Sequence, residues 1–266
     1  MRGRVLIVAG SDSGGGAGIQ ADIKAVTMLD GFAATAITAL TAQNTEGVFG
    51  ILPIAPDFIR QQMIVVLDDI GADAVKTGML HDAAVIETVA SVLAERGGGI
   101  PLVVDPVMVA KGGAKLIEDS AIDALKRLLA ARAAVLTPNL PEAEILCGRS
   151  IADVAAMKAA AEMLLRLGCR AVLVKGGHLP GDTLTDVLAT EAGFRTWESP
   201  RIDSRHTHGT GCTLASAIAA GLAQGLAIES AVDRARNYVM RAIASAPGFG
   251  RGHGPLDHAH PLRPLG

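Results

Sequence analysis

The chain is short of net charge and of aromatic residues, and both shortages exclude nucleic-acid partners. Its 266 residues carry a formal net charge of −3, and aromatics make up 3% of them. Proteins that bind nucleic acid track the phosphate backbone with basic residues and stack bases on aromatic rings. This sequence has no run of Lys and Arg for the first task, and its aromatics are too scattered for the second. We therefore expect no nucleic-acid partner.

Long hydrophobic runs and paired cysteines are also missing. The most apolar stretches, residues 5–10 and 35–42, are well short of the roughly 20 residues that span a bilayer. The first of them leads into a polar glycine loop, which predicts a first strand rather than a signal peptide. Cys147, Cys169 and Cys212 are far apart and odd in number, so neither a disulfide framework nor a zinc spacing is indicated. These features predict a cytoplasmic protein with no membrane partner.

The chain is instead rich in aliphatic residues, which form alternating patterns. Short apolar runs of strand length alternate with longer helical patterns, and this rhythm is typical of a mainly parallel sheet with helices on both faces. No internal repeat or long linker divides the chain, so we expect one domain over residues 1–266. Residues 183–198 predict an antiparallel hairpin at the sheet edge, and a tail rich in Gly, His and Pro ends the chain. The strands are expected at residues 5–9, 34–41, 74–77, 102–105, 133–137 and 171–175, and the helices at about 17–29, 56–70, 82–95, 119–131, 153–167, 211–224 and 228–245.

Polar residues gather at the expected strand ends and helix starts. In open parallel sheets, ligands bind along the carboxyl edge of the strands. A sheet protein without a site would also place polar residues in its loops, so the pattern favours a binding site only slightly. The residues concerned are Asp12, Gln43, Lys76, Asp105, Asn139, Lys175 and Cys212.

The segment His208–Cys212, HGTGC, precedes an apolar helical pattern. Its two glycines let successive backbone N–H groups point at one spot, where the helix N-terminus adds partial positive charge and so favours an anion. Thr210 could cap the helix or bind a phosphate oxygen, and the same field should lower the pKa of the Cys212 thiol. A plain helix cap beside a buried cysteine explains the spacing equally well.

Two further segments have weaker signals. Gly10–Gly18 is a glycine loop between a strand and a helix, but it has neither the Walker A nor the dinucleotide-binding spacing. It predicts either a flexible turn or backbone cover over a small ligand, with Asp22 facing back toward it. Lys175 precedes two glycines at a strand end, where it could reach a phosphate or simply be an exposed lysine.

Three residues could serve magnesium. Asn139 and Glu142 lie three residues apart where a strand enters a helix, so they could bind Mg²⁺ through water or form a capping box. Asp105 ends a buried strand, where its carboxylate could lie near Mg²⁺ or accept local N–H groups.

Other residues suit a flat heteroaromatic ring, or simply the core. Met79 and Val107 could provide apolar walls and Gln43 a hydrogen-bonding edge. A Met near a strand end is more often part of the core. The histidines of the C-terminal tail are expected to be solvated.

Seven motifs occur together and in order: AGSDSGGGAGIQADIKA, TALTAQNTEGV, KTGML, VVDPVMVAKGG, TPNLPEAEILCG, VKGGH and THGTGCT. From Val5 to about Gly254 the chain thereby resembles the hydroxymethylpyrimidine/phosphomethylpyrimidine kinases of thiamine biosynthesis, in the ribokinase-like superfamily. TAQNT, DPVM, TPN-x-x-EA and GTGC are specific in combination, although pyridoxal kinases of the same superfamily share several motifs.

The resemblance implies a fold and a reaction. The fold would be a three-layer α/β/α sandwich, with a mainly parallel central sheet and a small antiparallel edge. ATP and Mg²⁺ would bind at the carboxyl edge of the strands. The enzyme would phosphorylate 4-amino-5-hydroxymethyl-2-methylpyrimidine and then its monophosphate, and it would be a homodimer.

The resemblance also implies residue roles, by position in the matched motifs. Gln43 would bind the pyrimidine, and the backbone of Gly209, Thr210, Gly211 and Cys212 would form an anion hole. Cys212 occupies the position where sugar-kinase relatives have an Asp base. Around the ring would lie Gly10, Asp22, Met79 and Val107; Lys175 would reach the phosphates; and Asp105, Asn139 and Glu142 would serve magnesium.

The chain departs from the family pattern at three places. Ser13 and Gly14 replace a Pro-Ser pair, Lys111–Gly112 stands where a small polar residue is common, and Thr185 stands where Tyr is frequent. The first two changes bear on lid stiffness and second-phosphate contacts, not on the reaction class. A pyridoxal kinase is the nearest alternative, and a non-catalytic pyrimidine sensor is an alternative of another class.

Overall fold

The computed structural model describes residues 1–109 and 116–263; Lys111 and Gly112 lie outside them. The described strands form one nine-stranded sheet in the order β3-β2-β1-β4-β5-β6-β7-β8-β9. The six strands from β2 to β7 in this order are parallel, whereas β3 at one edge and β8 and β9 at the other are antiparallel. The strands are β1 Arg4–Asp12, β2 Phe32–Gln43, β3 Val48–Pro53, β4 Ala74–Thr77, β5 Leu102–Val104, β6 Val135–Leu136, β7 Ala171–Lys175, β8 Thr183–Thr190 and β9 Gly193–Pro200.

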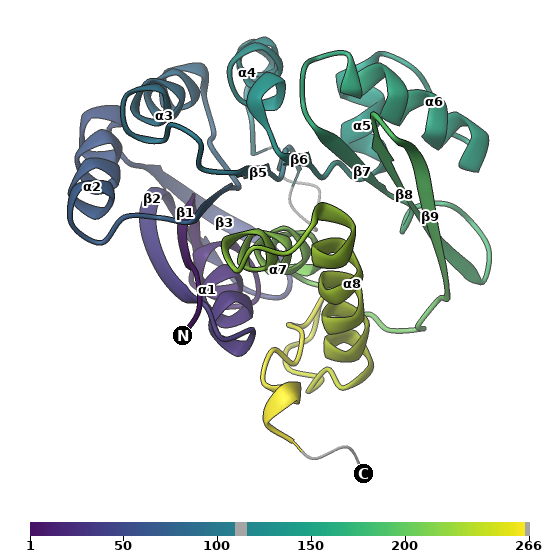
Figure 1. The fold of residues 1–266 in the computed structure, drawn as a ribbon. Helices are drawn as coiled ribbons and strands as arrows, with labels where there is room; N and C mark the ends of the chain where they lie inside the picture. Colours follow the sequence, from purple (N-terminus) through teal and green to yellow (C-terminus); the bar gives the residue numbers. More distant parts are fainter. Residues whose placement is uncertain (110–115, 264–266) are drawn as a thin grey trace.

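Helices cover both faces of the sheet (Figure 1). One face packs against α2 to α6 and the other against α1, α7 and α8. The helices are α1 Gly18–Met28, α2 Pro56–Asp69, α3 Ala83–Arg96, α4 Asp119–Ala124, α5 Leu140–Cys147, α6 Val154–Leu165, α7 Thr210–Ala223 and α8 Ile228–Ala244, with short π and 3₁₀ turns at Leu125–Leu129, Ala130–Arg132 and His260–Leu262.

Side-chain alternation in β1 produces the two cores. Leu6 and Val8 belong to the core beneath α2 to α6, whereas Val5 and Ile7 belong to the core beneath α1, α7 and α8. Successive side chains of a strand point to opposite faces, so a continuous apolar strand has to be covered on both sides. The predicted mainly parallel sheet with helices on both faces is confirmed.

Three parts of the chain differ from the expectation. Residues 48–53 form the edge strand β3, which the sequence did not predict. The helix expected over 119–131 is α-helical only to Ala124, then widens into a π turn and ends in a tighter 3₁₀ turn. The prediction that the tail histidines are solvated is wrong for His258, whereas His253 is exposed as expected. His258 is 5% exposed, and its carbonyl accepts a hydrogen bond from the Tyr238 hydroxyl at 2.8 Å.

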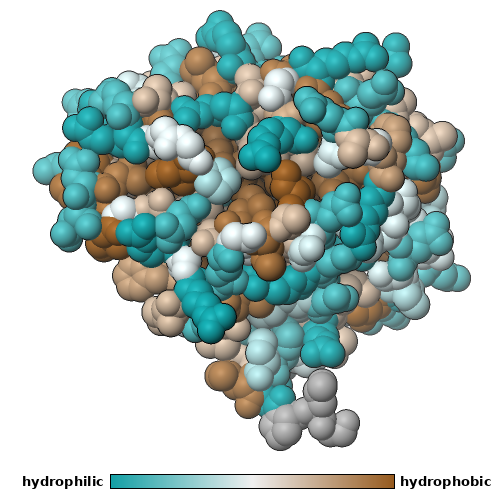
Figure 2. Space-filling model, in the orientation of Figure 1, coloured by the Kyte–Doolittle hydropathy of each residue, from teal (hydrophilic) through white to brown (hydrophobic). Residues whose placement is uncertain are grey.

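The outer surface is mixed in polarity. Figure 2 shows hydrophobic residues among hydrophilic ones on the left of the molecule, the side where Figure 1 places α2 and β2. No helix within the described ranges has both the length and the apolar character to cross a bilayer.

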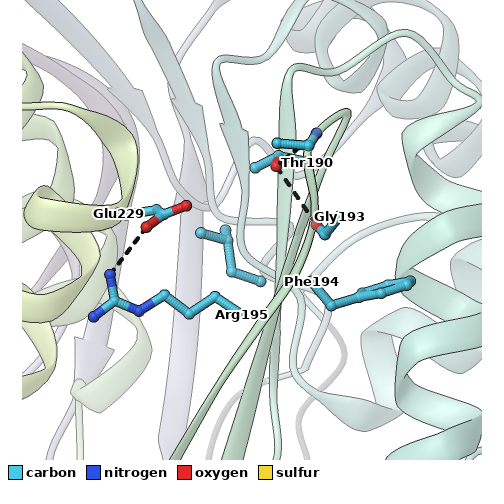
Figure 3. A pocket seen from close by; sticks show the side chains of 7 residues that line it. Thr190, Gly193, Phe194, Arg195 and Glu229 are labelled. Carbon is cyan, nitrogen blue, oxygen red and sulfur yellow. Dashed lines mark hydrogen bonds and ion pairs between the residues drawn. The ribbon is translucent and has the colours of Figure 1, made fainter.

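A small crevice lies between the β8–β9 turn and α8, far along the sheet from the carboxyl ends of β1 and β4. Figure 3 shows Arg195 and Glu229 facing each other across one side of it, while Phe194 points away on the other. The Arg195–Glu229 ion pair measures 3.0 Å, and the crevice holds about 60 Å³. A water molecule occupies about 30 Å³ in the liquid, so this crevice has room for little more than solvent.

Candidate active site

A cleft of about 1000 Å³ opens at the carboxyl ends of the parallel strands. This volume is at the upper end of the range of about 300–1000 Å³ for ligand pockets, so the cleft has room for more than one small molecule. Its lining comes from the ends of β1, β2, β4, β5 and β7, from the first turns of α5 and α7, and from the segments around Asp182 and Arg201.

Asp12 organises the glycine loop at one side of the cleft. Its Oδ1 accepts a hydrogen bond from the backbone of Gly14 at 2.8 Å, and its Oδ2 accepts from those of Gly16 at 3.1 Å and Ala17 at 2.8 Å. The same Oδ2 lies 2.8 Å from Nε2 of His208. Burial would raise the pKa of Asp12, but the bond from His208 and those from the loop outweigh it and hold this pKa below its usual range. Asp12 therefore remains a carboxylate that fastens one glycine loop to the other.

Gly209 is the N-cap of α7 and has a φ of 80°. A Cβ atom at this position would lie 1.8 Å from the carbonyl oxygen of Gly16, so the two glycine loops meet with no space for a side chain. The N–H groups of the first turn of α7 have no partner within the helix. Thr210 does not cap the helix through its side chain, because its hydroxyl donates to the carbonyl of Thr207 at 2.8 Å. The anion binding expected of this turn therefore depends on its backbone.

Lys175 lies beside this helix terminus. Its Nζ is 3.1 Å from Oδ1 of Asp105 and 3.1 Å from the point where a Cβ of Gly211 would stand. Burial would lower the pKa of Lys175, but Asp105 and Glu142 outweigh it and raise this pKa, so the lysine is cationic. Residues from three distant segments thus converge as the sequence predicted.

Asn139 and Glu142 form the predicted capping box at the start of α5. The Asn139 side chain accepts from the Glu142 backbone at 2.9 Å, and Glu142 Oε2 accepts from the Asn139 backbone at 2.8 Å. Burial, reinforced by Asp105 and opposed by Lys175, raises the pKa of Glu142 to about 7. A cation bound beside Glu142 would stabilise the ionised form of this carboxylate, which burial disfavours. The capping and metal roles of this pair are therefore compatible.

The prediction of a lowered thiol pKa at Cys212 is wrong. Burial raises the pKa of the Cys212 thiol to about 12; Lys76 opposes this rise, whereas Asp22 and Asp105 add to it. The backbone N–H of Gly18 also opposes the rise in this pKa. The field of one helix terminus is weaker than the loss of solvation in this cleft.

Four of the five residues expected around a ring line the same end of the cleft: Gly10, Gln43, Met79 and Val107. Asp22 is the exception and does not line the cleft. It is fully buried behind the cleft lining. Its carboxylate lies 2.8 Å from Nζ of Lys76 and accepts a hydrogen bond from the Ser216 hydroxyl at 2.7 Å. The expectation that Asp22 faces a ligand is corrected, because this ion pair occupies its oxygens.

The opposite end of the cleft was missed by sequence reasoning. Arg201 donates to the carbonyls of Gly177, Leu179 and Gly181 at 2.8, 2.5 and 2.8 Å, and so orders the loop that follows β7. No local motif marks Arg201, since it is one charged residue in an irregular segment. His208 was noticed only as part of HGTGC, and its bond to Asp12 spans 196 residues of sequence.

Comparison with known proteins identifies the family. A family model described as phosphomethylpyrimidine kinase matches residues 12–257. This chain belongs to the phosphomethylpyrimidine kinase family. A hydroxymethylpyrimidine/phosphomethylpyrimidine kinase of Bacillus subtilis is 49% identical over 96% of this chain and 94% of its own length. The thiamine biosynthesis bifunctional protein ThiED of Geobacter sulfurreducens is 53% identical over 97% of this chain, which spans 52% of that longer protein.

Solved structures agree with the family assignment and confirm the ribokinase-like fold. An ADP complex of Bacillus subtilis pyridoxal kinase has a TM-score of 0.91 at 36% identity and covers 100% of both chains. A phosphomethylpyrimidine kinase of Clostridium difficile has a TM-score of 0.80 at 40% identity, covering 90% of this chain and 99% of that one. Both groups of relatives are kinases, so the predicted phosphotransferase class is confirmed.

Proposed function

We propose that this single-domain protein transfers the γ-phosphoryl group of ATP to 4-amino-5-hydroxymethyl-2-methylpyrimidine and then to its monophosphate, in thiamine biosynthesis. The observation that carries the proposal is the convergence of the first turn of α7 with Lys175 and Asp105 in the middle of one cleft. Phosphoryl transfer needs positioning and charge neutralisation more than covalent chemistry by the protein. Such a cluster supplies both.

The phosphoryl group would lie against the backbone N–H groups of Gly209 to Cys212. These groups are fixed before substrate arrives, because Gly209 fits only against Gly16 and His208 is held by Asp12. Preorganised donors need no rearrangement as charge moves onto the γ-phosphoryl oxygens, and this is what makes them effective. Lys175 adds a fixed positive charge beside them.

Magnesium fits the donor set at Asp105 and Glu142. Within the described ranges no cluster of three His, Cys, Asp or Glu side chains could enclose a metal. Mg²⁺ is usually held by one or two carboxylates together with water and substrate phosphates, which matches two carboxylates at an open cleft. Asn139 would act through water, since its side-chain oxygen already accepts from the Glu142 backbone. When bound, the ion would offset the negative charge of the triphosphate.

Cys212 would act as base for the alcohol only. As the hydroxymethyl oxygen bonds to the γ-phosphorus, its O–H proton passes to the Cys212 thiolate and the bond from phosphorus to the ADP oxygen breaks. The thiol then returns its proton to solvent. A monophosphate acceptor has no such proton to give at neutral pH, so the base matters in the first phosphorylation and not in the second.

The variant Cys212→Ala tests this assignment. It should lower turnover on the alcohol far more than on the monophosphate, measured as ADP release with each acceptor under saturating ATP. Equal losses on both acceptors would remove Cys212 from the role of base.

The alternative substrate is pyridoxal, which also presents a hydroxymethyl group on a heteroaromatic ring. The similarity to pyridoxal kinases in the solved structures favours some overlap. Gln43 and Met79 at the ring end of the cleft favour the aminopyrimidine, because the amide offers a paired hydrogen-bonding edge. Comparing turnover on the two alcohols decides between them.

We also propose a homodimer in the cytosol, where its three free thiols would stay reduced. A strip of apolar residues on β2, β3 and α2 is exposed, and β3 is an edge strand. A second copy covering this strip would bury it. Sedimentation of Leu52→Asp should then shift toward monomer. The strip consists of Leu40, Phe49, Leu52, Phe58 and Val65.

A further inference from the structure

Helices α1 and α7 pack against each other, and their first turns meet beneath the cleft. Cys212 lies in the first turn of α7 and lines the cleft. One turn further along, Asp22 of α1 accepts from Ser216 of α7 at 2.7 Å. Residues four apart lie on the same face of a helix, so Cys212 lies one turn before Ser216 on the face of α7 that contacts Asp22.

Lys76, on β4, contacts the Asp22 carboxylate. Its side chain is 0% exposed, and Nζ lies 2.9 and 2.8 Å from the two oxygens of Asp22. A Cβ at Gly78 would lie 2.9 Å from Nζ, so the glycine leaves the space that the ammonium occupies. Lys76 also lines the cleft, as Cys212 does, whereas Asp22 does not. Lys76 therefore connects the buried Asp22 carboxylate to the part of the structure that lines the cleft, where Cys212 also lies.

Burying the charge of a lysine costs free energy unless an oppositely charged or hydrogen-bonding partner offsets the loss of water. Burial alone would lower the pKa of Lys76, but Asp22, Cys212 and Asp105 outweigh it and raise this pKa, so the side chain is cationic. The proposed phosphoryl transfer does not use Lys76, because Lys175 and the N-terminus of α7 neutralise the phosphates.

We propose that Lys76, held in place by Asp22, is a positioning residue whose positive charge stabilises the thiolate of Cys212. This inference rests on the proposed function, in which that thiolate accepts the hydroxymethyl proton. Four charged groups act on the thiol: Lys76 from β4, Asp22 from α1, Asp105 after β5 and Lys175 at the end of β7. Two are positive and two negative, so the loss of either member of the Lys76–Asp22 pair unbalances the field in a known direction.

The test compares two nearly isosteric variants with opposite changes of charge. Lys76→Met removes a positive charge and should reduce the thiolate fraction of Cys212, whereas Asp22→Asn removes a negative charge and should increase it. A neighbouring charge shifts a pKa by about one to three units. Since intrinsic nucleophilicity partly offsets the thiolate fraction, each unit changes the alkylation rate by about threefold. We expect at least about threefold slower alkylation at pH 8 in the first variant and threefold faster in the second.

The probe is iodoacetamide, and peptide mass spectrometry separates Cys212 from Cys147 and Cys169. Ser216→Ala is the matched control, because it removes a hydrogen bond to Asp22 without changing charge and should leave the alkylation rate within about twofold. A purely structural role for the pair predicts that both charge variants shift the rate in the same direction. That result, or unchanged rates in both, overturns the proposal.

The double variant Lys76→Met/Asp22→Asn keeps the test decisive if Lys76→Met does not fold. It should alkylate more slowly than Asp22→Asn, and equal rates in these two proteins would also overturn the proposal. Alkylation requires no kinase turnover, so its outcome is independent of the substrate. If the wild-type protein phosphorylated neither pyrimidine, the proposed function would be refuted. The alkylation rates of the variants would still show whether the charge of Lys76 stabilises the Cys212 thiolate.

Discussion

The raised pKa of Cys212 predicts an unusual pH dependence for one of the two phosphorylations. Burial raises the pKa of this thiol to about 12. The thiolate fraction at pH 8 is then about one in ten thousand, and it grows tenfold with each pH unit. If the thiolate takes the hydroxymethyl proton, turnover on the alcohol should grow with it.

The monophosphate acceptor supplies the internal reference. The second ionisation of a phosphate ester has a pKa of about 6, so this acceptor is a dianion from pH 7 upward and has no proton to lose. Effects of pH on ATP, on Glu142 or on stability act on both acceptors and cancel in the ratio. The ratio of alcohol to monophosphate turnover should therefore increase about a hundredfold from pH 7 to pH 9.

The assay measures initial rates of ADP release at saturating ATP and magnesium, with each pyrimidine in parallel. In Cys212→Ala the ratio should lose its dependence on pH. A ratio in the wild-type protein that stays constant, or that levels off near pH 8, would refute the reasoning: the first outcome removes the thiol as base, and the second shows that its pKa is not raised.

Three further predictions concern the anion hole, the metal site and the hairpin edge. Gly209→Ala should lower turnover on both acceptors by about a hundredfold, because its Cβ would overlap the Gly16 carbonyl and displace the helix terminus; ADP release with a melting control measures this. With a pKa of about 7, Glu142 is mostly protonated at pH 6 and mostly ionised at pH 8. Calorimetry should therefore find Mg²⁺ binding about tenfold tighter at pH 8 than at pH 6. The variant Glu142→Gln should abolish this difference in affinity. Arg236→Met should reduce the free energy of unfolding in urea by about 3–5 kcal/mol, since it leaves the buried Asp186 carboxylate, 2.8 Å away, without its cation.

Each of these has a contrary outcome. Full activity of Gly209→Ala would show that the α7 terminus tolerates displacement. Equal magnesium affinity at pH 6 and pH 8 would exclude Glu142 as the titrating ligand. A loss below about 1 kcal/mol in Arg236→Met would mean that water reaches the unpaired carboxylate.

The fold was largely predictable because its signals are local. Alternation of apolar strands with Ala-rich helices fixes a parallel sheet covered on both faces, and β1 shows this residue by residue. Strand β3 was missed because it lies at an edge and four of its six residues are exposed, so it lacks a periodic apolar pattern. The burial of His258 was missed because it depends on partners in other segments: its ring lies 2.9 Å from the Thr213 hydroxyl, and its carbonyl accepts from the Tyr238 hydroxyl.

The site was predictable in its members and not in its electrostatics. The motifs identified Gln43, Lys175 and the α7 terminus, and the structure brings them into one cleft. The thiol pKa of Cys212 depends on burial and on Lys76, and neither quantity is visible in a local pattern. The same holds for Asp22, whose spacing suggests a ligand contact although a lysine from another strand occupies its oxygens.

The central claim is that this cleft phosphorylates an aminopyrimidine alcohol and then its monophosphate. The most direct test is ADP release, coupled to a spectrophotometric readout, with the alcohol, its monophosphate and pyridoxal as separate acceptors. We expect turnover on both pyrimidines, with pyridoxal clearly slower than the pyrimidine alcohol. Turnover on pyridoxal alone, or on none of the three, would contradict it.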